Sequence, residues 1–241
     1  MNGPTLEACG GLVVGVDGCR AGWLAIAIDA GGATSWGVFA SFDQVPAHWP
    51  RVERLLIDMP IGLADDAPRA VEREARQRLG RPRASSVFAV PCRAAVYAPD
   101  YVSACARNRE RLGCAISKQA WHLTPKIREL DRWLAGAPAW REQVLEAHPE
   151  LCFAALTPSG QAMEAGKKTV AGQAARLELL AAHFAAARRL HEEIVEATRR
   201  ADVARDDVTD ALVLAMSARG PLARIPATDQ ACAHMVFPKR A

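Results

Sequence analysis

Two apolar runs that each lead into an aspartate constrain the fold of this chain more than any other feature. Residues 12–16 are apolar or glycine and run into Asp17, and residues 55–57 run into Asp58 shortly before Pro60. Continuous apolar segments of this kind are typical of strands buried on both faces, and a proline stops such a strand. If the two strands are parallel, both aspartates lie at the sheet edge where α/β proteins bind ligands.

The links between the strands predict how the strands pair. Residues 23–28 and 35–39 are further strand candidates, and short Gly-rich links join them to the first strand. Short links permit only antiparallel neighbours, because a parallel crossover requires about a dozen residues or more. A predicted helix at 42–49 precedes the strand that ends at Asp58, so this strand can lie parallel to the first.

The rest of the chain is predominantly helical. The predicted segments are a helix at 69–79, a loop at 82–99, helices at 101–112 and 118–134, a strand at 143–148, a helical stretch at 173–200 with room for one break, a helix at 207–217, and an unassigned tail at 225–237. We therefore predict one α/β domain over residues 1–241. Its mixed sheet combines an antiparallel three-strand meander with parallel strands, and a mostly helical insertion spans about 65–140. The first nine residues are predicted to be loose.

Composition excludes several classes of protein. Of the 241 residues, 50% are hydrophobic and 24% are charged, and the net charge is +3. This excludes disorder, and any basic surface must be local. No apolar run reaches the roughly 18 residues of a membrane span. A signal peptide begins with a positively charged segment, whereas no Lys or Arg precedes Arg20. The seven Cys form no C-x-x-C pair, which disfavours a zinc ribbon or a disulfide framework. We expect a cytoplasmic protein with no membrane association.

Five acids are the candidate catalytic residues. They are Asp17 and Asp58 on the first and fourth strands, Glu146 on the last predicted strand, and Asp207 and Asp210 on one face of the final helix. Converging carboxylates repel one another unless a cation lies among them, and Mg²⁺ or Mn²⁺ prefers oxygen ligands. Two such ions about 4 Å apart can hydrolyse a phosphodiester. Taken singly, each acid can also be a turn residue or a helix N-cap.

The order of elements resembles the RNase H-like fold, and the residues Asp207–Ala215 resemble the Asp-x-x-Asp helix of Holliday-junction resolvases. A closer resemblance is to family 429 of the domains of unknown function, which is described as predicted RNase H-like nucleases. It rests on GVDGCRAGW from Gly15, IDMPIGL from Ile57, SSVF from Ser85 with Pro91 and Arg93, KIRELD from Lys126, and EAHPE from Glu146 with Phe153. The chain departs from that pattern at Val71 and Glu72, where Cys and Asp are expected.

The resemblance implies roles for the acids. Asp17 would bridge two metal ions, and Asp58 and Asp210 would flank it as further ligands. Asp207 would be a fourth metal ligand, and Glu146 would belong to the same catalytic set. Resolvases often have Glu where this chain has Asp58.

Basic and hydroxyl residues in the insertion are the candidate substrate-binding groups. Guanidinium groups pair well with phosphate oxygens, and serine hydroxyls add neutral donors. The candidates are Arg69, Arg83, Ser85, Ser86, Arg93 and Lys126, with the Lys167–Lys168 pair as a weaker version of the same idea. The alternative is that the arginines form a solvated helix face. His148 could be a general base, a ligand or a structural histidine.

These residues predict a metal-dependent nuclease or phosphodiesterase that acts on DNA or RNA with Mg²⁺ or Mn²⁺. One alternative is a phosphotransferase or ATPase of the actin and sugar-kinase group, although the turn after Asp17 lacks that group's second glycine and hydroxyl residue. Another is a non-catalytic protein that binds nucleic acid or nucleotide. The sequence leaves a homodimer open.

Overall fold

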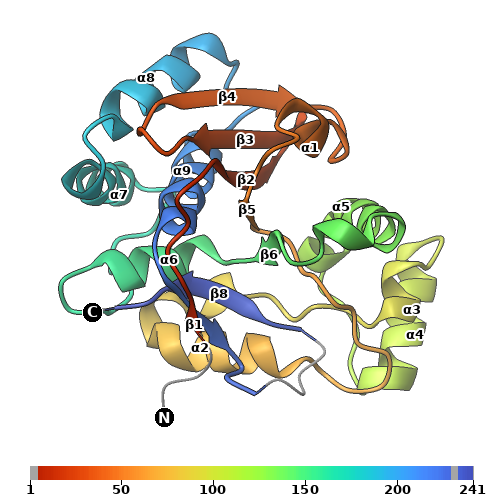
Figure 1. Ribbon diagram of the computed structural model, residues 1–241. Helices are drawn as coiled ribbons and strands as arrows, with labels where there is room; N and C mark the ends of the chain where they lie inside the picture. The colour runs from red at the N-terminus through yellow and green to blue at the C-terminus, as the bar shows by residue number, and fades with distance from the viewer. Residues whose placement is uncertain (1–4, 229–232, 241) are drawn as a thin grey trace.

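The computed structural model describes residues 5–228 and 233–240. A five-stranded mixed sheet lies at its centre, with the strand order β4-β3-β2-β5-β6 (Figure 1). The strands are β2 Val13–Cys19, β3 Gly22–Ile28, β4 Thr34–Phe39, β5 Arg54–Ile57 and β6 Val144–Glu146. The first three form an antiparallel meander, whereas β2, β5 and β6 are parallel. This confirms the predicted α/β class and mixed sheet, and it is consistent with an RNase H-like fold.

Strand register places the two aspartates side by side. Val16 pairs with Ile57, and the backbone N–H of Asp58 donates to the carbonyl of Val16 over 3.1 Å. The first strand was predicted to end at Asp17, but β2 continues to Cys19, so this aspartate lies inside the strand. The longer β2 is held by its partner β3, which pairs with it along its whole length.

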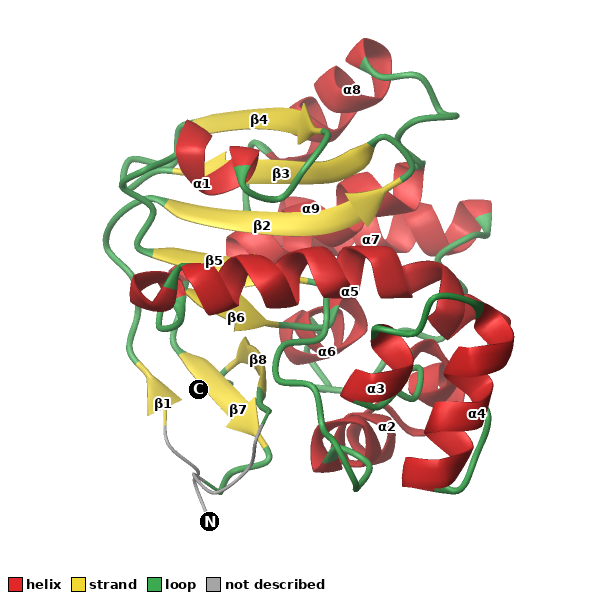
Figure 2. Cartoon of the chain, turned by 90° about the vertical axis from the view of Figure 1, so that its right-hand side faces the viewer, coloured by secondary structure: helices red, strands yellow, loops and turns green. Residues whose placement is uncertain are grey.

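The two faces of the sheet are covered by different helices (Figure 2). Helix α9, Arg205–Arg219, crosses one face, and helix α5, Lys118–Gly136, covers the other, so that each face has its own apolar core. A Cβ atom at Gly15 would lie 2.2 Å from the carbonyl oxygen of Ala211 and the backbone nitrogen of Ala215. Glycine on β2 is therefore what permits the close approach of α9.

The predicted insertion is helical and has a small core of its own. Its elements are α2 Ala70–Arg83, the 3-10 turn η1 Ala84–Ser86, α3 Arg93–Val96, α4 Tyr101–Leu112, α5 and η2 Pro138–Trp140. Helix α2 is longer than predicted and kinks at Gly80, whose φ is +62°. Helix α3 lies within a segment that was predicted to be a loop. The sequence did not reveal this helix because a single turn is too short to show a periodic pattern.

The remaining elements complete the two layers. They are β1 Thr5–Leu6, α1 Gln44–His48, α6 Pro149–Leu156, α7 Val170–His183, α8 Ala187–Ala197, β7 Leu222–Ile225 and β8 Met235–Pro238. The long helical stretch breaks once, as predicted. The prediction of a loose N-terminus is wrong for β1, which pairs with β7 in a second sheet, β1-β7-β8. Part of the unassigned tail, residues 229–232, lies outside the described residues. None of the described helices is long and apolar enough to cross a bilayer.

Candidate active site

A cavity of about 320 Å³ opens where β2 and β5 meet the N-terminal turns of α9. Its lining is dominated by acidic residues from these three elements. They are Asp17 of β2, Asp58 after β5, and Asp206, Asp207 and Asp210 of α9. The structure therefore brings together four of the five acids predicted from the sequence, and it adds Asp206 and, from α6, Glu150.

The alternation of side chains along the strands explains which acids converge. Val14 and Val16 point into the core under α5, whereas Gly15 faces α9. Asp17 has the same parity as Gly15, so it lies on the face that α9 crosses. On β5, Leu56 belongs to the core under α9, and Asp58 follows it two residues later.

Glu146 does not join this cluster, because the same alternation places it on the opposite face. Its neighbour Leu145 packs toward the core under α9, so Glu146 itself points away from it. Its carboxylate is buried and contacts Arg69, with 2.5 Å between Oε1 and Nη2, and it accepts a 2.7 Å hydrogen bond from the N–H of Ile61. Burial raises the pKa of Glu146, and the Arg69 guanidinium counteracts this rise. The predicted catalytic acid and the predicted phosphate ligand are thus each other's partners.

The cavity is electrostatically unfavourable for its own carboxylates. Burial raises the pKa of Asp17 well above its ordinary value, and Asp58, Asp210 and Asp207 raise it further in that order. Burial also raises the pKa of Asp58. It raises the pKa of Asp210 to about 6 even though Lys167 lowers it. Such a site gains free energy when it binds a cation.

Lys167 already supplies one positive charge. Its Nζ donates to Oδ2 of Asp210 over 2.6 Å and lies 3.7 Å from Oδ2 of Asp206. The other oxygen of Asp210, Oδ1, is buried and has no hydrogen-bond partner among residues 5–228 and 233–240. In the part of the chain that the structure describes, no three His, Cys, Asp or Glu side chains are already arranged to hold a metal ion.

Asp207 has two roles in the structure. The N-cap residue of α9 is Ala204 rather than Asp207, and Oδ2 of Asp207 accepts a 2.8 Å hydrogen bond from the N–H of Ala204. Burial raises the pKa of Asp207, and this backbone hydrogen bond lowers it. The capping interpretation and a position in the cavity are therefore compatible, because a carboxylate has two oxygens.

Most of the predicted substrate-binding residues have other partners. Arg83 donates from Nε to the carbonyl of Met163 over 2.7 Å. Arg93 forms a bidentate pair with Asp131 at 2.6 and 3.0 Å, beside a separate cavity of about 310 Å³. The Nζ of Lys126 lies 4.5 Å from the ring centroid of Trp23.

The two serines and Lys126 remain close to the cavity. Ser86 lines it, and its hydroxyl donates to the carbonyl of Arg83 over 2.7 Å. Ser85 lines the neighbouring groove. Burial lowers the pKa of Lys126, and the nearby carboxylates, Asp17 among them, act in the opposite direction.

His148 lines the cavity, but both of its ring nitrogens contact backbone groups. Its Nδ1 accepts a 3.2 Å hydrogen bond from the N–H of Glu150 and caps α6, and its Nε2 lies 3.4 Å from the carbonyl of Ser86. Because Nδ1 is an acceptor, the proton of the neutral ring is on Nε2. This favours the structural interpretation of His148.

A groove of about 750 Å³ adjoins the acidic cavity, and Phe88 and Gln119 line both. Arg73 and Arg76 of α2 lie along it. Neither arginine is among the substrate-binding candidates selected from the sequence. Their spacing of three residues on one helix, facing the same way, is the signal that could have found them.

Comparison with known proteins gives a family. No curated protein and no solved structure matches the chain. The model of DUF429, described as a protein of unknown function, matches residues 15–231, which include all five aspartates of the cavity. The chain therefore belongs to the DUF429 family.

Proposed function

We propose that this protein is a metal-dependent phosphodiesterase that acts on nucleic acid, with Mg²⁺ or Mn²⁺ as its cofactor. The observation that carries the proposal is the convergence of Asp17, Asp58, Asp207 and Asp210 on one cavity at the sheet edge. Carboxylates from separate elements that destabilise one another persist when they serve a bound cation.

The residues present fit a hard divalent ion. All the charged acceptors are carboxylate oxygens, which such ions prefer to nitrogen or sulfur. The buried Oδ1 of Asp210 has no hydrogen-bond partner in the described residues, so it is available as a ligand. Asp17, Asp58 and Asp210 would hold the ion, with Oδ1 of Asp207 beside them. A bound ion would supply an activated water and neutralise charge on the leaving oxygen.

The chain's own residues would bind and orient the substrate. Arg73 lines the groove and offers guanidinium donors to phosphate oxygens, and Arg76 beside it can do so through its Nη groups, since its Nε donates to the carbonyl of Val87 over 2.9 Å. Ser86 lies at the cavity itself. Phe88 lies at the junction of groove and cavity, where an aromatic ring can stack on an unpaired base. A phosphate backbone that follows the groove would therefore pass the aspartates.

Substitution of Asp17 tests the proposal directly. Purified wild type and Asp17→Asn would be incubated with labelled single-stranded DNA, duplex DNA, RNA and a four-way junction, with MnCl₂ or EDTA. We expect cleavage in Mn²⁺ only, reduced in the variant by about two to three orders of magnitude. Glu142→Gln, which removes an exposed acid, is the matched control. Equal cleavage by Asp17→Asn and wild type, both folded, would contradict the proposal.

The same samples separate the alternative functions. Stabilisation by ATP–Mg²⁺ in a thermal-shift assay, accompanied by ATP hydrolysis, would favour the actin and sugar-kinase group. Binding of nucleic acid without cleavage or metal uptake would favour a non-catalytic binding protein.

A further inference from the structure

The ammonium group of Lys167 lies among the cavity aspartates, where a bound metal ion would otherwise lie. It lies in the loop between α6 and α7, and its Nζ reaches Oδ2 of Asp210 at 2.6 Å. Asp206 lies 3.7 Å away on the same helix. The side chain is only 36% exposed, so most of it is withdrawn from solvent.

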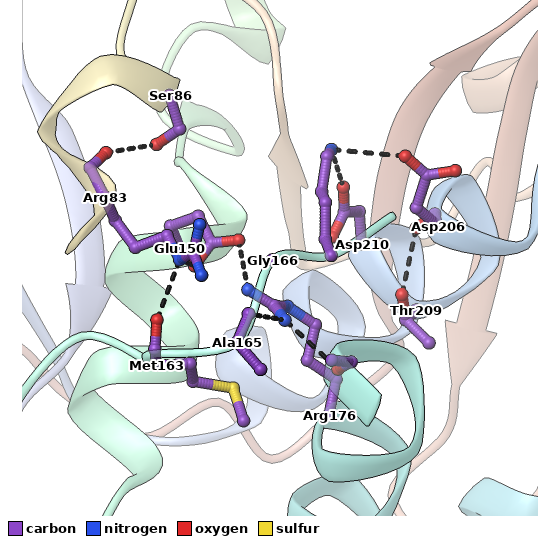
Figure 3. Close-up of polar contacts among 12 residues, drawn as sticks. Arg83, Ser86, Glu150, Met163, Ala165, Gly166, Arg176, Asp206, Thr209 and Asp210 are labelled. Atoms are coloured by element: carbon purple, nitrogen blue, oxygen red, sulfur yellow. Dashed lines mark hydrogen bonds and ion pairs between the residues drawn. The ribbon is translucent and has the colours of Figure 1, made fainter. Parts of the chain in front are cut away.

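The loop that carries Lys167 is anchored by two arginines (Figure 3). Arg83 donates to the carbonyls of Met163 and Glu164, and Arg176 donates to the carbonyl of Ala165 over 3.0 Å. Arg176 is completely buried, and its Nη2 pairs with Oε1 of Glu150 over 2.6 Å. These anchors fix the backbone immediately before the lysine.

Close packing fixes the backbone on the other side. The N–H of Thr169 donates to the carbonyl of Gly166 over 3.0 Å, and its hydroxyl accepts from the N–H of Gly172 to cap α7. A Cβ atom at Gly172 would lie 1.9 Å from the oxygen of Gly166, so the loop rests directly on the helix. Lys167 is therefore held at the aspartates rather than resting there as a mobile surface side chain.

The ammonium group lies against Asp210 and carries its charge at neutral pH, because the ordinary pKa of a lysine is about 10.4. A lysine that stays protonated has three N–H donors and no lone pair, so it can bind a phosphate oxygen but cannot accept a proton.

We propose that Lys167 is a built-in cation that takes the place of one of the two metal ions, so that the cavity binds a single divalent ion. The inference rests on the proposed function and deepens it. It replaces the two-ion site expected from the sequence with one ion and one ammonium group. The Glu150–Arg176 pair and Arg83 are the residues that position the lysine.

Counting bound Mn²⁺ tests this inference without any measurement of cleavage. Free Mn²⁺ would be followed by electron paramagnetic resonance as MnCl₂ is titrated into the protein. We expect one ion per chain for the wild type and two for Lys167→Met, because the variant releases Asp210 and Asp206 as ligands. Lys167→Arg keeps a charge and should bind one ion. Lys168→Met removes the adjacent exposed lysine of the same cavity and should also bind one.

Thermal unfolding provides a second readout. In EDTA we expect Lys167→Met to melt at a lower temperature than the wild type. The substitution removes Lys167, which is the only ion-pair partner of Asp210 among the described residues. Saturating Mn²⁺ should raise the melting temperature of this variant more than that of the wild type, because two ions bind the folded state. Lys167→Gln serves as a second neutral variant if the methionine does not fold.

The outcomes distinguish the two proposals. Two Mn²⁺ per wild-type chain, or one per chain in folded Lys167→Met, overturns the role of Lys167 and leaves the proposed function standing. No Mn²⁺ uptake by the wild type or by any variant overturns the metal-dependent function and this inference together.

Discussion

At the scale of the residue, the candidate site is a set of buried charges that oppose one another. Asp17, Asp58 and Asp210 are brought together by separate elements, and Lys167 is the cation that contacts one of them directly, at Asp210. Burial and mutual repulsion both raise the pKa of Asp17. The arrangement lowers the stability of the metal-free protein, as expected when function and stability compete.

The first prediction concerns the stability of Asp17→Asn. In EDTA at pH 8 this variant should be more stable than the wild type by at least about 1 kcal/mol, since one unit of pKa shift is worth about 1.4 kcal/mol. Asparagine can still accept the hydrogen bond that Oδ1 of Asp17 receives from the N–H of Gly18. Mn²⁺ should stabilise the wild type but not the variant. Chemical denaturation with and without Mn²⁺ measures both effects, and a less stable variant in EDTA would contradict the prediction.

The second prediction concerns Glu72, which shares Arg69 with Glu146. Burial raises the pKa of Glu72 from 4.5 to about 7, although Arg69 counteracts it. The charged form is therefore disfavoured in the folded state. The free energy of unfolding should fall as the pH rises from about 4.5 to about 7, by up to about 3 kcal/mol.

Glu72→Gln should remove this dependence. The variant should match the wild type near pH 4 and exceed it at pH 8, because Glu146 still neutralises Arg69. Denaturation curves across this range provide the measurement. If the free energy of unfolding changed with pH in the same way for both proteins, ionisation of Glu72 would not destabilise the folded state, and the prediction would be wrong.

At the scale of the element, the contact between β2 and α9 decides whether the site exists. Gly15 lets the backbone of α9 lie directly on β2, and this contact sets the distance between Asp17 and the aspartates of the helix. Alternation along the strand then selects the face: Asp17 lies on the α9 side, while Glu146 on β6 points to the other.

The third prediction tests this contact. Gly15→Ala should destabilise the protein by about 1–3 kcal/mol or more, because the new methyl group overlaps the backbone of α9. The shift of α9 should also weaken Mn²⁺ binding. Gly136→Ala is the control, since a Cβ atom there meets nothing within 4 Å. Urea denaturation and Mn²⁺ titration of both variants test the prediction, and a neutral Gly15→Ala would refute it.

At the scale of the whole molecule, the insertion supplies a basic groove and the sheet supplies the acids. The groove and the acidic cavity share Phe88 and Gln119, so the two parts form one continuous surface. Arg73 is exposed there, whereas Arg69 is buried with Glu146. Under the proposed function, substrate affinity and metal affinity would therefore depend on separate residues.

The fourth prediction exploits this separation. Arg73→Ala should weaken binding of single-stranded DNA and lower the slope of log affinity against log salt concentration by about one. Its Mn²⁺ stoichiometry should be unchanged. Arg51→Ala removes an exposed arginine that precedes β5, at the opposite sheet edge, and should leave DNA binding unaffected. Fluorescence anisotropy at several salt concentrations distinguishes the two variants. Equal losses of DNA affinity in both variants would show that the nucleic acid does not bind along the groove.

The sequence by itself determined the strands of the central sheet and the edge of that sheet near which Asp17 and Asp58 lie. Apolar runs and short links are local signals, and they suffice to define strands and antiparallel pairing. Local signals did not define β1, β7 and β8, whose short strands depend on pairing between distant segments.

Only the tertiary structure decided which charged residues meet. The sequence placed Glu146 among the catalytic acids and Arg69 among the phosphate ligands, whereas in the folded protein the two side chains form an ion pair. It ranked Lys167 low, whereas the anchored loop brings it to Asp210. The physical reason is that a side chain's partner depends on strand parity, helix approach and loop anchoring, and these come from contacts between residues far apart in the chain.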